Sequence, residues 1–152
     1  MEAMAEKVKC LIAGHPEIIN FGSENDYVGD DWVERAESVL GYPLSPSYLW
    51  FLQNYGGGEI GSEEIYSIYG MEFDGVCGGD IVYHHIIGRN AGWDTSKLLV
   101  SETDFGESFM FDCSSVFEGE YPILQRLPSG ELIHYATDFY GFLYKRILAH
   151  VS

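Results

Sequence analysis

The residues of this sequence that could bind a metal are five histidines, three cysteines and 24 carboxylates. His84 and His85 form its only adjacent histidine pair, whereas zinc needs three or four ligands that converge on one point. Neighbouring side chains diverge on a strand and lie about 100° apart on a helix, and no H-E-x-x-H or C-x-x-C pattern supplies further ligands. We therefore expect no metal site and interpret both histidines as ordinary half-buried residues.

No local pattern marks a catalytic centre either. Nucleophilic catalysis needs a Ser or Cys activated by a base, and the sequence has no G-x-S-x-G elbow. A carboxylate pair such as Glu63 with Asp104 could serve glycoside hydrolysis, but any chain this acidic offers such pairs. The run Gly56-Gly57-Gly58 ends a predicted helix and precedes Glu59, whereas a phosphate loop opens a helix and carries a lysine. We expect a protein that is not an enzyme and uses no cofactor.

The charge is the most informative feature. The 24 acidic residues against 8 basic ones give a net charge of −16, more than solubility requires. No Lys or Arg occurs between Arg35 and Arg89, nor between Lys97 and Arg126. Such a chain repels the phosphates of nucleic acids and anionic lipids and attracts basic proteins. We therefore expect no direct nucleic-acid or membrane partner, and a basic protein partner.

Acidic residues in these two base-free windows are the predicted partner-binding residues, although each one alone could be an ordinary solvated side chain. They are Glu59, Glu63, Glu64, Glu72, Asp74, Glu102, Asp104 and Glu107. Aromatic side chains at a surface supply much of the binding energy of protein interfaces, and the predicted anchors are Tyr66, Tyr69 and Trp93. The same aromatic set, which includes Phe105, is expected to lie mostly in the core.

The length and the cysteine content limit the possible architectures. With 152 residues, 46% of them hydrophobic, the chain can bury one sizeable core, so we expect one domain over residues 1–152. Cys10, Cys77 and Cys113 are odd in number and widely spaced, which is typical of a reducing compartment. The first residues are too polar for a signal peptide or a membrane span. We expect a cytoplasmic protein, and a monomer by default.

The first third of the chain predicts three helices. Residues 6–13 place apolar side chains at helical spacing, and Asp30 or Asp31 can cap a second helix that stops at Gly41. Ser45 can cap a third helix with Pro46 at its first position. That helix ends at the three glycines 56–58.

The rest of the chain predicts a sheet and a last helix. Strands are expected at residues 59–60 and 65–69, then at 98–101, 108–112, 122–127 and 132–136. Residues 80–89 suit a strand by β-branched content or a helix by an Asp80 cap. Thr137 or Asp138 caps the final helix. The predicted fold is α+β, with N-terminal helices packed on one mainly antiparallel twisted sheet and a C-terminal helix.

One stretch also resembles a known family. Glu37-x-x-Leu40-Gly41, followed by 44–58, is similar to the helical signature of the SMI1/KNR4 superfamily, called SUKH. In that signature Glu-x-x-Leu-Gly runs into Leu-Pro-x-Ser-Tyr, a Phe-Leu pair and a Gly-Gly end. Here the proline, Pro46, comes one position later. The likeness extends over residues 31–149 and favours a helix at 80–89.

The resemblance implies a function as well as a fold. Bacterial members of this superfamily frequently serve as immunity proteins that bind and block a polymorphic or contact-dependent toxin, often a nuclease. We therefore expect an inhibitor of a basic, nuclease-type toxin domain. The alternative is a non-catalytic regulatory adaptor that binds endogenous proteins, because the superfamily also includes a eukaryotic regulator of cell-wall synthesis.

Overall fold

The N-terminal third of the chain is helical, as its capping residues predict. The computed structural model describes residues 2–73 and 78–151. Its first helices are α1 (Glu2–Gly14), the short 3-10 helix η1 (Glu24–Asp26), α2 (Asp30–Leu40) and α3 (Pro46–Tyr55). Ser45 caps α3 as predicted, because its hydroxyl accepts the Tyr48 N–H. The predicted side-chain cap of α2 is wrong, since Gly29 takes the cap position and Asp30 and Asp31 lie in the first turn.

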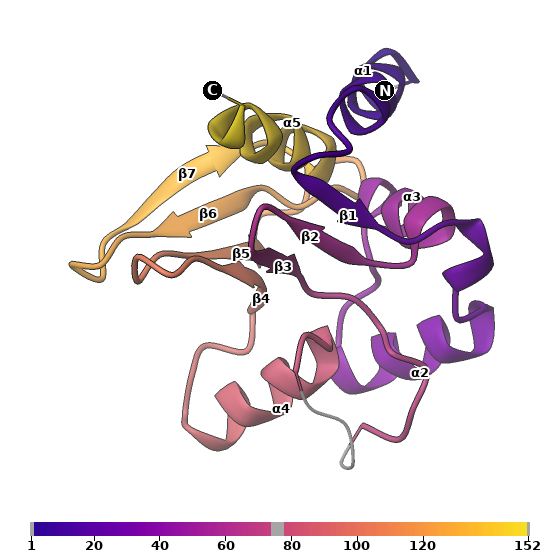
Figure 1. Cartoon of the computed structure of the whole chain (residues 1–152). Helices are drawn as coiled ribbons and strands as arrows, with labels where there is room; N and C mark the ends of the chain where they lie inside the picture. Colours follow the sequence, from indigo (N-terminus) through magenta and orange to yellow (C-terminus); the bar gives the residue numbers. More distant parts are fainter. Residues whose placement is uncertain (1, 74–77, 152) are drawn as a thin grey trace.

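Seven strands of the described chain form one antiparallel sheet, in which each strand pairs with the next along the chain (Figure 1). The strands are β1 (Ile19–Phe21), β2 (Gly58–Ile60), β3 (Glu63–Ile65), β4 (Lys97–Glu102), β5 (Ser108–Asp112), β6 (Ile123–Arg126) and β7 (Leu132–Ala136). Strand β1 was not predicted, because three residues carry no periodicity of their own. The predicted strand 65–69 is also wrong: the ladder ends at Ile65, and Ser67 bridges to Asp80 instead.

The ambiguous segment after β3 is helix α4 (Ile81–Asn90). The buried Asp80 carboxylate accepts the N–H groups of Val82 and Tyr83 at 2.8 and 3.0 Å, which satisfies the first turn. The same carboxylate accepts the Tyr69 N–H at 2.9 Å. Asp80 therefore starts the helix and ties it to the segment that follows β3.

Helices lie on both sides of the sheet. The last helix, α5 (Phe139–His150), is capped by Asp138 and packs against α1, α3 and the strands β2 and β7. Helix α4 contacts β4 and α2 on the other side, and Figure 1 shows these two helices below the sheet with α1 and α5 above it. The core between α3, α5 and the sheet is aromatic, with Tyr48, Phe51, Phe109, Phe111, Phe139 and Phe142 fully buried. No helix in the described part is long and apolar enough to cross a membrane.

Candidate protein-binding surface

Three predicted acidic residues lie in a row across one face of the sheet. Glu59 on β2 is directly opposite Glu64 on β3, and Ile65 is opposite Ser101, which places Glu64 beside Glu102 on β4. Opposed residues of paired strands project to the same face. Like charges in such positions repel each other and destabilise the sheet, so this row has a cost in stability.

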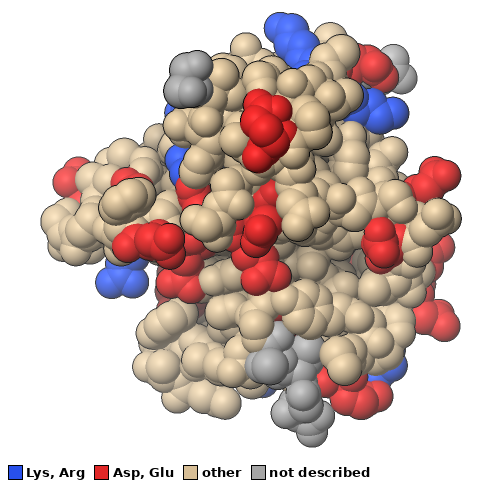
Figure 2. Space-filling view, viewed as in Figure 1, with Lys and Arg blue, Asp and Glu red and all other residues tan. Residues whose placement is uncertain are grey.

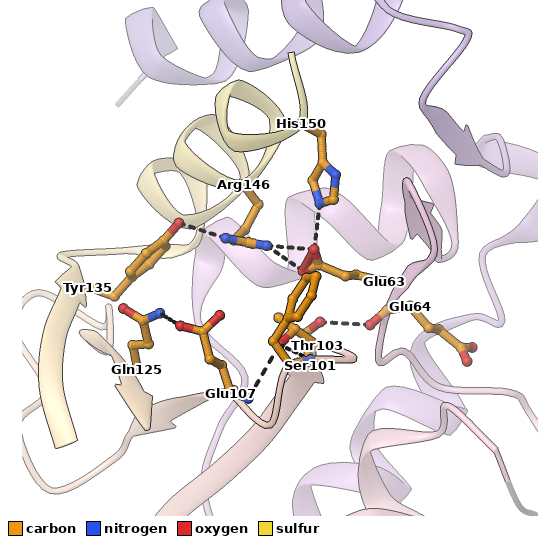
Figure 3. Close-up of polar contacts among 10 residues, drawn as sticks. Glu63, Glu64, Ser101, Thr103, Glu107, Gln125, Tyr135, Arg146 and His150 are labelled. Carbon is orange, nitrogen blue, oxygen red and sulfur yellow. Dashed lines mark hydrogen bonds and ion pairs between the residues drawn. The ribbon is translucent and has the colours of Figure 1, made fainter. Parts of the chain in front are cut away.

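Two more predicted acids, Asp104 and Glu107, lie in the turn between β4 and β5. The Thr103 hydroxyl accepts the N–H groups of Phe105 and Glu107 at 3.2 and 3.3 Å, which fixes the turn. The Glu107 carboxylate accepts the Gln125 amide of β6 at 2.8 Å (Figure 3). The turn is therefore held in one conformation, with Glu107 on the α5 face of the sheet, because its partner Gln125 is opposite the buried Phe109.

Glu59, Glu64, Glu102 and the turn residue Asp104 are called the acidic surface below. Among the described residues, none of the four forms an ion pair. Figure 2 shows acidic side chains across the middle of the face that includes β2–β5, with basic ones mostly near its margins. Within the described residues, no basic side chain therefore pairs with the acidic surface.

Glu63 does not belong to this surface. It projects to the other face of the sheet and is 8% exposed. Its carboxylate accepts two bonds from the Arg146 guanidinium of α5, at 2.5 and 2.6 Å, and contacts His150 (Figure 3). Burial lowers the pKa of Arg146, but bonds to Glu63 and Tyr135 raise it more, so its pKa is above the usual value. Glu63 anchors α5 to the sheet.

The two remaining predicted acids are peripheral or undescribed. Glu72 is exposed and pairs with Arg35 of α2 at 2.9 Å, so its charge is partly compensated. Asp74 lies outside the described residues. Neither strengthens the acidic surface.

The two predicted tyrosine anchors orient the carboxylates of the row. Tyr66 is only 7% exposed and its hydroxyl donates to Glu102 at 2.7 Å, while its ring stacks on His84 at 4.0 Å. Tyr69 is 38% exposed and its hydroxyl donates to Glu64 at 2.8 Å. Burial and the bond to Glu64 raise the pKa of Tyr69 to about 12. Tyr66 is thus a supporting residue, and Tyr69 can also touch a partner.

Trp93, the third predicted anchor, lies in a different place. It is 54% exposed and lines a cleft of about 380 Å³ on the face of β4–β7 opposite α5. Trp93, Leu99, Met110 and Leu132 are its large apolar side chains, and its charged ones are Asp94, Lys97, Glu102 and Arg126. Glu102 belongs to both the cleft and the acidic surface, so the two adjoin.

Phe105 is a residue that the sequence interpretation placed wrongly. It was expected in the core, but it is 83% exposed at the tip of the β4–β5 hairpin. Its position between Asp104 and Gly106, in the short polar segment between two predicted strands, is the signal for a turn. An exposed aromatic residue flanked by carboxylates is a stronger interface candidate than the buried Tyr66.

The histidines do not assemble a metal site in the described part of the chain, where no three His, Cys, Asp or Glu residues are grouped to hold an ion. His84 is 2.6 Å from the Gly78 carbonyl through Nε2. His85 is 8% exposed, and burial together with the nearby Arg89 charge lowers its pKa. Both histidines therefore pack against their own chain.

A comparison with protein families shows which family this chain belongs to. Residues 30–143 match the SUKH_6 model, described as SMI1-KNR4 cell-wall. The chain belongs to the SMI1-KNR4 family. The match runs from the start of α2 into α5, so it includes every residue of the acidic surface. Membership in the SMI1-KNR4 family is consistent with a protein of the immunity type that binds another protein. No curated protein matches the chain.

Proposed function

We propose that this SMI1-KNR4 protein is a non-catalytic immunity protein that binds and neutralises a cognate bacterial toxin in the cytoplasm. The toxin is of the polymorphic or contact-dependent kind, and its toxic domain is basic and nuclease-like. The observation that carries the proposal is the row of Glu59, Glu64 and Glu102, three adjacent carboxylates without an ion-pair partner among the described residues.

Electrostatics explains why such a row favours this partner. A nuclease needs a basic surface to hold phosphates, and an acidic protein can occupy the same field. Complementary potentials raise the association rate and exclude partners of the wrong charge. The row repels nucleic acid, so the inhibitor binds the nuclease and not the nucleic acid that the nuclease cleaves.

The repulsion within the row also supports a binding role. Glu59 faces Glu64 directly, and opposed like charges destabilise a sheet. A basic partner reduces that repulsion when it binds, so part of the cost in the free protein becomes binding free energy. An ordinary solvated surface would gain stability from interspersed bases, and this row has none.

The carboxylates of the row are also held in place before binding. Tyr69 donates to Glu64, and Tyr66 donates to Glu102. Ordered side chains lose less conformational entropy on association, so more of the interaction energy contributes to affinity. These two bonds support a preformed binding surface.

The experiment that tests the proposal is co-expression of the tagged protein with the product of the neighbouring gene, followed by calorimetry at about 50 mM and about 500 mM NaCl. We expect a stoichiometric complex with a basic toxin domain, with a Kd on the order of 1 nM that rises with salt. Weak binding of several endogenous proteins instead would favour the adaptor function. A tight complex indifferent to salt would exclude the acidic surface as its basis.

A further inference from the structure

Phe105, the most exposed large hydrophobic residue in the described part of the chain, is held away from the rest of that part. Its side chain is 83% exposed, and its N–H donates to the Thr103 hydroxyl at 3.2 Å. A Cβ on Gly106 would lie 3.9 Å from Pro128, so the tips of the β4–β5 and β6–β7 hairpins support each other. Phe105 is therefore presented to solvent on a fixed turn, where its burial requires another molecule.

An apolar cleft lies next to this turn. Its large apolar side chains are Trp93, Leu99, Met110 and Leu132, and its volume is about 380 Å³. Trp93 and Leu132 are 54% and 45% exposed. Phe105 is not among the residues that line the cleft of its own chain.

One charge of the turn is complementary to one charge of the cleft. Asp104 precedes Phe105 in sequence, and the charged residues of the cleft are two acidic ones, Asp94 and Glu102, and two basic ones, Lys97 and Arg126. Within the cleft, Asp94 pairs with Lys97 at 3.3 Å and Glu102 accepts the Tyr66 hydroxyl. Arg126 also lines the cleft, and among the described residues it has no ion pair. The cleft thus suits an aromatic side chain that brings a carboxylate to Arg126.

We infer that the occupant of the cleft is the Phe105 turn of a second copy of this chain. The turn and the cleft adjoin on one edge of the molecule, so a two-fold axis lets each copy insert Phe105 into the cleft of the other. Each Asp104 then lies near Arg126 of the opposite copy. This inference does not depend on the proposed function. It gives a homodimer in place of the monomer expected by default.

The dimer has a consequence for the acidic surface. The inserted turn carries Asp104, and the cleft includes Glu102. These two carboxylates are covered in the dimer, whereas Glu59 and Glu64 lie outside the cleft. Self-association and the binding of a basic partner therefore compete.

The test is sedimentation velocity of the full chain alone, from about 5 µM to about 500 µM, with an expected dimer Kd on the order of 10 µM. Phe105→Ala should raise the Kd at least about tenfold, as expected for an aromatic anchor. Phe117→Ala is the matched control, because Phe117 is 74% exposed but lies in the β5–β6 loop at the opposite end of the strands. It should leave the Kd within about twofold.

A charge swap tests the proposed pairing. Asp104→Arg and Arg126→Glu should each weaken the dimer about tenfold, and the double variant should restore it to within about threefold. In a Trp32→Phe/Trp50→Phe background, the fluorescence of Trp93 should shift to the blue as the concentration rises.

Several results would overturn the inference. The first is a monomer at every concentration, which would leave the cleft to an aromatic side chain of a foreign protein. The second is an equal effect of the two phenylalanine variants on the dimer Kd. The third is a double charge variant that dimerises more weakly than both single variants. Because only this chain is used, the result is independent of whether a toxin partner exists.

Discussion

Glu63 and Glu64 are neighbours in the chain but project to opposite faces of the sheet. Glu63 accepts two bonds from the partly buried Arg146 guanidinium, at 2.5 and 2.6 Å. Glu64 is exposed, faces Glu59 across the hairpin and has no ion pair in the described structure. The alternation of a strand thus separates a stabilising carboxylate from one that is available to a partner.

Removal of either carboxylate should separate these two roles. Glu63→Ala leaves the partly buried Arg146 without its partner and should lower the free energy of unfolding by about 3–5 kcal/mol. Glu64→Ala removes an exposed, repelled charge and should change it by less than about 0.5 kcal/mol. Urea unfolding of both variants measures this difference. Equal losses would mean that the pair with Arg146 adds no stability.

A second buried carboxylate should also contribute to stability. Glu120 accepts the Ser47 N–H at 2.9 Å and the Ser47 hydroxyl at 2.5 Å, and that hydroxyl accepts the Phe139 N–H at 3.0 Å. Ser47→Ala leaves the Phe139 N–H and part of the carboxylate unsatisfied and should cost about 1–3 kcal/mol. Thermal unfolding of this variant beside the exposed Ser129→Ala tests the difference. Equal melting temperatures would refute it.

Asp80 should be needed both for α4 and for the segment after β3. Its carboxylate accepts the N–H groups of Tyr69, Val82 and Tyr83, so Asp80→Ala should cost about 2 kcal/mol or more. Hydrogen exchange should show faster exchange of exactly these amides. Asp138→Ala, which removes the cap of α5, is the control. Protection of Val82 and Tyr83 that survives Asp80→Ala would contradict the prediction.

The buried His85 should make stability depend on pH. Burial, with a smaller effect of Arg89, lowers its pKa below 6.5 in the folded chain. On acidification the unfolded chain therefore takes up the proton first, and the free energy of unfolding falls from about pH 6.5 down to the folded-state pKa. Below that pKa the loss is complete.

The comparison of His85→Gln with the wild type, by urea unfolding between about pH 5 and pH 8, isolates this contribution. The wild type should lose more stability on acidification than the variant. His134→Gln, at an exposed position of β7, is the control and should follow the wild type. If the free energies of unfolding of the wild type and His85→Gln change in parallel with pH, the pKa of His85 is the same in the folded and unfolded chain.

Local chemistry was enough to predict most of the elements. Helix α3 followed from Ser45, Pro46 and the glycines after Tyr55, because a cap and a stop act within one turn. The three residues of β1 were missed, since that strand exists only through its pairing with β2. The helical form of residues 81–90 depended on a family resemblance, because β-branched content and the Asp80 cap favour opposite structures.

The candidate surface was harder to predict because it depends on register. The sequence shows that Glu63 and Glu64 project to opposite faces of a strand. Which of the two faces the helix α5 and which faces solvent depends on the pairing with β2 and on Arg146, which is 83 residues away. The charge distribution places Glu59, Glu64 and Glu102 in windows without Lys or Arg, and their adjacency appears only in the sheet. Phe105 was misplaced because hydrophobicity alone does not distinguish a turn from a core.

The central claim is that the acidic surface binds a basic toxin domain, and association kinetics of charge-reversal variants test it most directly. Glu64→Lys/Glu102→Lys is compared with wild type by stopped flow against the co-purified toxin domain at several salt concentrations. Glu6→Lys on α1, across the sheet from the acidic surface, is the matched control, and each protein is kept below the concentration at which it self-associates. We expect the double variant to associate at least about tenfold more slowly and with a flatter salt dependence, while the control is nearly unchanged. Unchanged kinetics of the double variant, or an equal loss in the control, would show that the acidic surface does not bind the toxin domain.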